Sequence, residues 1–201
     1  MNKITEKYLT GLKKAYFDNN AQEEWNHFEK IKHGLTPKNI EELSKLYPEI
    51  PDSLISLLEY VDGTYWREYA GEEITFFLLG SDMEEYPYYL LSSQEIIDNQ
   101  HQASTYYSDY IERQYEEVEI DDKITNTTEN LKWLHFSDCI NNGGTSQLYI
   151  DFSPSPTGKV GQVVRYVHDP DELKVIADSF EDYLQQLIDN RYDFINEDML
   201  G

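Results

Sequence analysis

Two apolar runs separated by a short polar segment constrain the fold of this chain more than any other feature. The first run is LYIDF at residues 148–152, and the second extends from Val160 to Val167. The intervening SPSPTGK is rich in the Ser, Pro and Gly residues that favour turns. The pattern predicts a β-hairpin. Asp151, near the end of the first run, is expected to accept hydrogen bonds from N–H groups of the turn, and Gly161 is expected to bend the returning strand through a bulge or a close backbone approach.

The string Gly158-Lys159-Val160-Gly161 in this segment invites comparison with a phosphate-binding loop. A P-loop requires Gly where Ser153 stands and Ser or Thr where Val160 stands. The spacing also fails the dinucleotide-binding pattern, and a strand instead of a helix N-terminus is expected to follow. We therefore expect no phosphate site here.

No other pattern indicates catalysis, a metal or a cofactor. The single Cys139 fits a small buried hydrophobe, and no nucleophile-elbow motif occurs. His168 lies near Asp169 and Asp171, which is more typical of a polar turn than of a metal site. Carboxylates are so abundant that a catalytic pair cannot be recognised from spacing. We expect no catalytic, metal-binding or cofactor-binding residues. The other histidines are scattered, at positions 27, 33, 101 and 135.

Helical periodicity dominates the first third of the chain. Thr36 is expected to cap a helix that begins at Pro37, and Pro48 and Pro51 separate this helix from the next. Gly63 is expected to end that next helix in a left-handed conformation. The predicted buried stripes are Ile4, Tyr8, Leu12, Ala15 and Tyr16; Trp25, Phe28 and Ile31; Ile40, Leu43 and Tyr47; and Leu54, Leu57, Leu58 and Val61.

Strand patterns follow, and a last helix closes the chain. Ser92 and Glu95 form a capping box, Asn142-Gly143-Gly144 is a turn signal, and Asp169-Pro170-Asp171 is expected to break the chain. The last helix is expected to start at Asp178, with Glu181 at the N3 position. Helices first, then mostly strands joined by short turns, then a last helix predict an α+β fold with an antiparallel sheet. The predicted strands are 74–79, 88–91, 132–136, 147–152 and 160–167, and the last helix buries Phe180, Tyr183, Leu184, Leu187 and Ile188.

The chain of 201 residues carries 16 Lys and Arg against 39 Asp and Glu, a net charge of −23. Such a charge repels nucleic acid and anionic membranes and favours basic partners. The aromatic content of 14% argues against disorder. The amphipathic N-terminus lacks the apolar core of a secretory signal, and no run is long enough to span a membrane. We therefore expect a cytoplasmic protein.

One domain is expected over residues 1–201, with an acidic, tyrosine-rich insertion around 92–130. Residues 109–122 carry seven acidic residues and one Arg. This segment is interpreted as either a solvated helix face or a mobile excursion. Residues 121–130 have the composition of a loop.

Three segments together resemble the SUKH superfamily, which includes the fungal Smi/Knr-type cell-wall regulators and many bacterial toxin-immunity proteins. They are Ile50-Pro51 followed by LISLLEYVDG, then LYIDFSPSPTGKVGQVV, then VIADSFEDYLQQLI. The resemblance implies a twisted, mostly antiparallel sheet with helices packed around it, no catalytic residues, and a binding role. It implies either an immunity protein that neutralises a toxin or a regulatory scaffold of the cell-wall type. The residues that carry this motif are Pro51, Gly63, Asp151, Gly158, Gly161, Gln162 and Phe180.

The expected partner is a cognate toxin domain with a basic surface, such as a nuclease, which needs cations to hold phosphates. Tyr and Trp side chains would anchor it, and acids would steer the encounter. The stretches 63–69 and 83–88 mix acidic and aromatic residues. The alternative interpretation is that these rings cover an edge of the sheet. The candidate contact residues are Tyr65, Trp66, Glu68, Tyr69, Glu72, Glu73, Glu84, Glu85, Tyr86 and Tyr88.

Overall fold

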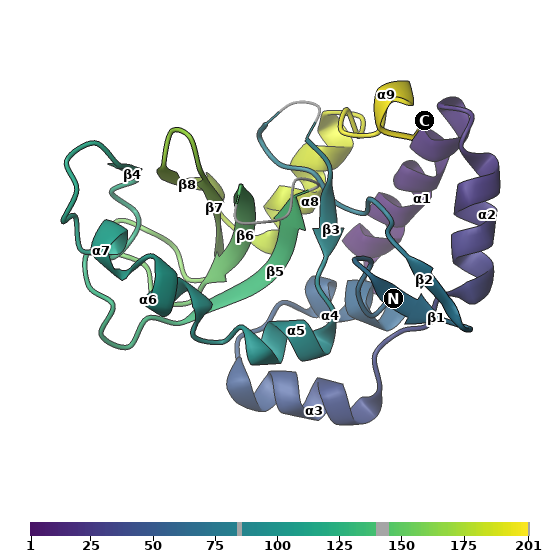
Figure 1. The fold of residues 1–201 in the computed structure, drawn as a ribbon. Coiled ribbons are helices and arrows are strands. Elements are labelled where there is room, and N and C mark those ends of the chain that lie inside the picture. Colours follow the sequence, from purple (N-terminus) through teal and green to yellow (C-terminus); the bar gives the residue numbers. More distant parts are fainter. Residues whose placement is uncertain (84–85, 140–144, 201) are drawn as a thin grey trace.

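The computed structural model describes residues 1–83, 86–139 and 145–200, and within them it shows helices packed around a six-stranded sheet beside a separate two-stranded hairpin (Figure 1). The helices are α1 (Lys3–Asp18), α2 (Gln22–Ile31), α3 (Pro37–Leu46), α4 (Asp52–Tyr60), α5 (Ser93–Asp98), α6 (Gln102–Tyr106), α7 (Ser108–Ile111), α8 (Phe180–Asp189) and α9 (Glu197–Leu200). The strands are β1 (Arg67–Tyr69), β2 (Glu72–Ile74), β3 (Tyr88–Leu90), β4 (Glu119–Ile120), β5 (Trp133–Cys139), β6 (Ser146–Asp151), β7 (Gln162–Val167) and β8 (Glu172–Ala177).

The local signals in the helical third of the chain are confirmed. The Thr36 hydroxyl accepts a hydrogen bond from the Asn39 N–H, and Pro37 is the first residue of α3. The four predicted apolar positions of the fourth helical segment are fully buried. Ser92 and Glu95 form the reciprocal capping box that begins α5. Side chains that satisfy the free N–H groups of a first turn fix where each helix begins.

The large sheet has the order β3-β5-β6-β7-β8-β4. Its neighbours pair antiparallel, except that β4 pairs parallel with β8. The predicted hairpin of β6 and β7 is confirmed, with Asp151 opposite Gln162 at its closed end. The α+β class and the mostly antiparallel sheet are therefore confirmed. The turn signal at 142–144 lies outside the described residues.

Both faces of the sheet are buried, in two separate hydrophobic clusters. Alternate residues of one strand point to opposite faces. Leu148 and Ile150 of β6 therefore join the larger cluster with α1, α4 and α8, whereas Tyr149 faces the smaller one. The smaller cluster is closed by apolar side chains of α6 and α7, namely Ala103, Tyr107, Tyr110 and Ile111.

From α6 onward, the insertion at 92–130 therefore covers one face of the sheet, whereas its first helix, α5, joins the larger cluster through Ile96. Its residues 109–122 contain the end of α7 and the edge strand β4, with the exposed residues 112–117 between them. Arg113 stabilises this segment by donating hydrogen bonds to backbone carbonyls of Ile111, Asp121, Ile124 and Thr125. In Figure 1, α6 and α7 lie at one end of the molecule, and α2 and the β1–β2 hairpin lie at the other.

Two strand predictions need correction. The run 74–79 is not a strand: it is buried at Phe76, Leu78 and Leu79, but only Ile74 belongs to a ladder. The Phe76 N–H donates to the Thr64 carbonyl and the Leu78 N–H to Tyr88, so single contacts replace a regular ladder. Strand β8, in contrast, was not predicted. The chain turns back at Asp169–Asp171 to form it along β7.

Two helix ends also differ from the prediction. The N-cap of the last helix is Ser179, one residue after the expected start at Asp178, and its hydroxyl accepts a hydrogen bond from the N–H of Asp182, so that α8 begins at Phe180. Helix α4 ends at an extended Val61, so Gly63 is not its cap. Gly63 does have a positive φ of 92°, and a Cβ there would lie 2.8 Å from backbone atoms of Ser92. Close packing of two chain segments therefore requires this glycine.

Gly161 lies just before β7 with a φ of 89°, and its N–H donates to the Asp151 carbonyl. It ends the turn instead of producing a bulge. The irregularity of β7 falls between Val163 and Val164.

In the part of the chain that the structure describes, no helix combines the length and the apolar character needed to cross a membrane.

Replacement of Tyr107 by Ala is expected to lower the free energy of unfolding by about 3–5 kcal/mol, because it opens a cavity in the smaller cluster. Tyr107 is 7% exposed, and its ring is tilted against that of Tyr166, with the ring centroids 4.3 Å apart. The neighbouring Tyr106 is 72% exposed, so Tyr106→Ala should stay within about 0.5 kcal/mol of the wild type. Urea unfolding of the two variants measures the difference. Equal effects would contradict a core role for the insertion.

Gly63→Ala is expected to destabilise the fold more than Gly161→Ala. Both positions have positive φ, which costs a residue with a Cβ about 1–2 kcal/mol. Only at Gly63 does the added Cβ meet other atoms, whereas at Gly161 nothing lies within 4 Å. Overpacking adds about 1–3 kcal/mol at Gly63. Urea midpoints that fall equally in the two variants would refute the contact with Ser92.

Candidate functional site

The candidate contact surface is centred on the β1–β2 hairpin. Its two strands are joined by Ala70 and Gly71, which both have positive φ, as type I′ turns require. The register places Arg67 opposite Ile74, Glu68 opposite Glu73 and Tyr69 opposite Glu72.

The alternation of side chains divides the hairpin into two faces. Tyr69 points inward, is 0% exposed and donates its hydroxyl hydrogen to the Gly63 carbonyl at 2.8 Å. Glu68 and Glu73 point outward and are exposed, and so is Trp66, two residues before Glu68. We call Glu68 and Glu73, together with the exposed Trp66 that immediately precedes β1, the hairpin face.

Contacts on both sides of Trp66 fix its position. Thr64 exchanges hydrogen bonds with Leu90, through its N–H at 2.8 Å and its hydroxyl at 2.9 Å. Arg67 forms an ion pair with the buried Asp62 at 3.1 Å. Trp66 itself has a φ of 46° and a side chain that is 62% exposed. A bulky residue in the left-handed region is strained and persists only where its surroundings impose it.

A row of aromatic rings continues from Trp66 over β3. The Tyr65 ring centroid lies 6.1 Å from Trp66 and 4.8 Å from Tyr89, and Tyr89 lies 5.2 Å from Phe77. Phe77, which is half-buried, was not among the candidate residues. Tyr89, which links Phe77 to Tyr65, is only 6% exposed and is buried like Tyr88.

The electrostatics of the hairpin are unbalanced. Glu68 and Glu73 are direct cross-strand neighbours, and like charges in such pairs are destabilising. Within the described residues neither carboxylate forms an ion pair, whereas Glu72 lies 2.9 Å from His27 Nε2. The carboxylates of the hairpin face therefore point into solvent without a cation.

The structure brings only part of the candidate set together. Tyr65, Trp66, Glu68, Glu72 and Glu73 gather on or beside the hairpin. Tyr69 and Tyr88 are corrections: both are 0% exposed, and the Tyr88 hydroxyl bonds to Ser146 at 2.6 Å, so they belong to the core. Tyr86 is partly buried and precedes β3 at the end opposite Leu90. Glu84 and Glu85 lie outside the described residues.

Asp151 has the structural role that the sequence predicts. Its carboxylate accepts hydrogen bonds from the Ser153 N–H at 2.7 Å and from Gln162 Nε2 at 2.9 Å. Gln162 also donates to the carbonyl of Lys123, and its own oxygen accepts from the Lys159 N–H. The Gly158 N–H closes the turn on Ser155. These bonds tie the β6–β7 turn to the loop that follows β4.

Burial raises the pKa of the Asp151 carboxyl from its ordinary 3.8 to about 6, against the opposing effect of its hydrogen bonds. A raised pKa is a feature of catalytic acids. Asp151, however, is 0% exposed and both of its oxygens are engaged. It therefore has no access to a substrate.

The two remaining residues of the family motif lie at helix ends. Pro51 is the N-cap of α4, and Phe180, fully buried, is the first residue of α8. The Phe180 ring packs edge-on against Phe136 of β5, with centroids 5.4 Å apart. The motif residues hold helices and turns to the sheet.

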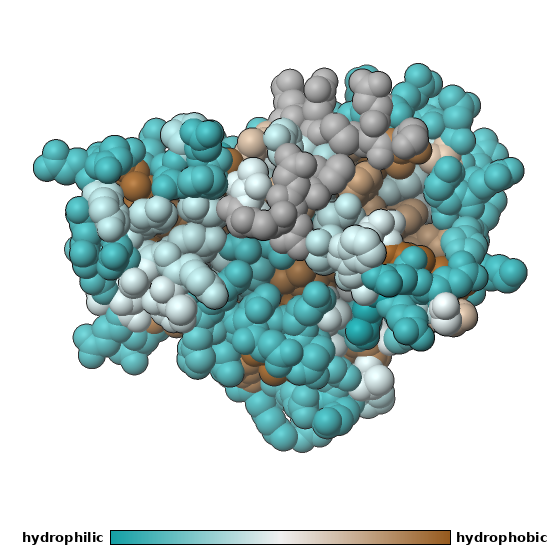
Figure 2. All heavy atoms as spheres, viewed as in Figure 1, coloured by the Kyte–Doolittle hydropathy of each residue, from teal (hydrophilic) through white to brown (hydrophobic). Residues whose placement is uncertain are grey.

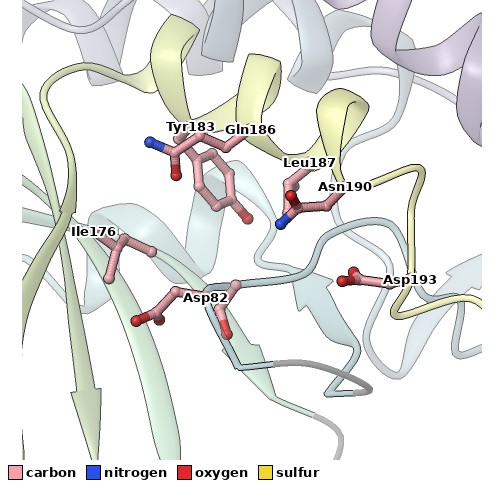
Figure 3. Close-up of a pocket in the computed structure, with 8 residues that line it drawn as sticks. Asp82, Ile176, Tyr183, Gln186, Leu187, Asn190 and Asp193 are labelled. Atoms are coloured by element: carbon pink, nitrogen blue, oxygen red, sulfur yellow. The ribbon is translucent and has the colours of Figure 1, made fainter.

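A cavity of about 290 Å³ lies between β8, α8 and residues 81–82 (Figure 3). Tyr183 stands at its centre and donates to the Gly80 carbonyl. The Asp82 carboxylate at its edge is engaged by Arg165 at 2.5 Å and by Lys174 at 2.8 Å. Gln186 and Asn190 add amides from α8. Asp193 adds a second carboxylate to the lining, whereas Asp82 and Tyr183 are both engaged by neighbouring groups.

Other titratable clusters in the described residues are structural. His168 lies 2.6 Å from the Asp171 carboxylate, which also accepts from Tyr110 and Tyr166, as a polar turn would. Cys139 is fully buried. No group of three or more His, Cys, Asp or Glu in the described residues is arranged to hold a metal ion.

Comparison with known families gives one match. The model of the SMI1/KNR4 family (SUKH-1) matches residues 34–186, a range that contains the hairpin, the large sheet and Asp151. No curated protein matches the chain.

The pH dependence of stability is expected to change when Asp151 is replaced by Asn. With its pKa raised to about 6, folded Asp151 keeps a proton that the unfolded chain loses above about pH 4. Its contribution to the free energy of unfolding therefore falls as pH rises from about 4 to 6, by about 3 kcal/mol. The free energy of unfolding of the wild type, measured by urea unfolding, should therefore fall by about 3 kcal/mol relative to that of Asp151→Asn between about pH 4 and about pH 6.

Asp178→Asn is the control, and its stability relative to the wild type should change with pH in the opposite direction. Lys159 lies 2.6 Å from the Asp178 carboxylate and lowers its pKa. The stability that this ion pair contributes is present at neutral pH and is lost as pH falls through the lowered pKa. A difference between wild type and Asp151→Asn that does not vary with pH would contradict the burial of a titrating Asp151.

Proposed function

The chain belongs to the SMI1/KNR4 family (SUKH-1), and we propose that it is a non-catalytic protein-binding domain that acts as an immunity protein, neutralising a toxin by direct binding. The proposed toxin has a basic surface, as a nuclease does. The proposed site of action is the cytoplasm. The observation that carries the proposal is the hairpin face, where an exposed Trp stands beside two carboxylates without cations, within a member of this family.

The distribution of charge supports a basic partner. Of the 16 Lys and Arg side chains, nine form ion pairs with acids among the residues that the structure describes. The 39 acidic residues therefore leave a large surplus on the surface. Such a surplus raises the rate of encounter with a basic protein and disfavours nucleic acid. The nine are Lys14, Lys32, Lys38, Lys45, Arg67, Lys123, Lys159, Arg165 and Lys174.

The visible surface also fits a polar, charge-guided interface. On the face drawn in Figure 2, hydrophilic residues dominate and hydrophobic residues show as small separate areas. Interfaces of proteins that also exist alone are about as polar as the rest of the surface, with a few aromatic anchors. The exposed Trp66 and the half-buried Tyr65 within acidic surroundings match that composition.

The alternative is a regulatory scaffold of the cell-wall assembly type, with which the family match is equally compatible. A scaffold binds several endogenous partners, whereas an immunity protein binds one cognate toxin tightly. Affinity capture from the native lysate, followed by identification of the captured proteins, separates the two. A set of several chromosomal partners and no toxin would favour the scaffold.

Binding to the toxin domain encoded beside this gene is expected to be tight and salt-dependent. Calorimetry between about 50 and about 500 mM NaCl should show affinity falling tenfold or more, because ions screen the charges that attract the partner. Co-expression should restore growth of cells that make the toxin. No rescue, or turnover of the toxin, would contradict the proposal.

A further inference from the structure

An exposed indole lies next to an exposed pair of carboxylates at the β1–β2 hairpin. Glu68 and Glu73 are direct cross-strand partners, and such partners have Cβ atoms about 5 Å apart. Trp66 lies in the bend immediately before β1 and is 62% exposed. Because Cα atoms two residues apart lie at most about 7 Å from each other, the indole and the carboxylate of Glu68 are within reach of one long side chain.

Trp66 differs from the other tryptophans of the chain. Trp25 and Trp133 are 1% and 2% exposed, whereas Trp66 is 62% exposed. Its strained backbone is held by the bonds of Thr64 to β3 and by the Arg67–Asp62 ion pair. Because its position is fixed before any partner arrives, little conformational entropy is lost on binding.

The two carboxylates require a cation that the described chain does not supply. Glu68 and Glu73 repel each other across the hairpin, and the nearest basic residue along the strand, Arg67, points to the other face and is bound to Asp62. A cation placed between the carboxylates would relieve this repulsion and gain two ion pairs.

We infer that the hairpin face binds an arginine side chain of a basic partner protein, with the guanidinium stacked on Trp66 and bonded to Glu68 and Glu73. This inference rests on the proposed function, because it names the chemistry that the partner presents. The planar guanidinium stacks on an aromatic face and bonds carboxylates through a rigid fork, whereas the ammonium of lysine is a more strongly hydrated point charge. The face therefore selects arginine over lysine.

The first experiment titrates the full chain with two blocked pentapeptides, acetyl-Gly-Arg-Gly-Arg-Gly-amide and its lysine counterpart. The readout is the NMR signal of each Trp indole N–H. The signal of Trp66 should shift saturably, while those of the buried Trp25 and Trp133 stay in place and act as internal references. The arginine peptide should bind several-fold more tightly than the lysine peptide.

Paired substitutions separate local recognition from net charge. Glu68→Gln with Glu73→Gln should reduce binding of the arginine peptide at least about tenfold. The control, Glu116→Gln with Glu117→Gln, removes the same charge from two exposed residues in the insertion, at the other end of the molecule. It should change binding less than about twofold.

Trp66→Gly tests the aromatic contact, with peptide binding followed by fluorescence anisotropy. Glycine adopts positive φ without strain, so the urea midpoint should stay close to that of the wild type while arginine selectivity disappears. Trp66→Tyr should keep part of that selectivity. Equal binding of the two peptides to the wild type, or equal losses in the two Gln pairs, would overturn the inference.

The cognate toxin domain distinguishes this inference from the proposed function. If the toxin binds and its affinity survives both Trp66→Gly and the Glu68/Glu73 pair, the hairpin face is not the arginine site, although the immunity role stands. If no toxin binds while the peptide selectivity holds, the immunity role fails and the arginine site stands.

Discussion

The need to bury both faces of the six-stranded sheet determines how the rest of the chain is arranged. Strands β5, β6 and β7 carry large apolar side chains on both sides, so one layer of helices cannot cover them. Helices α1, α4 and α8 cover one face, and the part of the insertion from α6 onward covers the other. The buried Arg165, bonded to Asp82 and Glu172, joins the sheet to the loop before β3. Removing one partner of a buried ion pair leaves the other charge buried without compensation, which strongly destabilises the fold. The short β1–β2 hairpin remains outside this sheet, with one of its faces free for contacts.

Most local capping signals led to correct predictions, with Gly63 as an exception, whereas several features that depend on distant partners were missed. The caps at Thr36 and Ser92 are determined by residues three positions apart, so the sequence alone specifies them. The run 74–79 has the composition of a strand, but its N–H groups bond to Thr64 and Tyr88 individually. The β1–β2 hairpin was missed because its turn, Ala70-Gly71, lacks the Asn or Asp typical of such turns. Strand β8 was missed because Asp169-Pro170-Asp171 was interpreted as a break.

The candidate surface was predicted in composition but not in orientation. A mixture of acids and aromatics identifies a segment, yet only the strand register decides which side chains are buried. That register places Tyr69 under the hairpin and Glu68 on its outer face, one residue apart. The structural role of Asp151 was predictable because an Asp at the end of a strand bonds to the turn two residues later. Its second partner, Gln162, is eleven residues away and required knowledge of the hairpin pairing.

In the proposed function, attraction and recognition are carried by different parts of the molecule. The surplus of carboxylates is distributed over the whole chain, and individual exposed charges contribute little to affinity. Such a field raises the rate of encounter without distinguishing one basic protein from another. Discrimination requires a rigid group of defined shape, and Trp66 is held in place by contacts on both sides, unlike the solvated acids around it. Mutation of scattered acids should therefore alter mainly the association rate, whereas changes at the hairpin face should alter the dissociation rate. Stopped-flow measurements on the Glu116/Glu117 and Glu68/Glu73 double variants separate the two contributions. If both double variants changed only the association rate, recognition would be assigned to another surface.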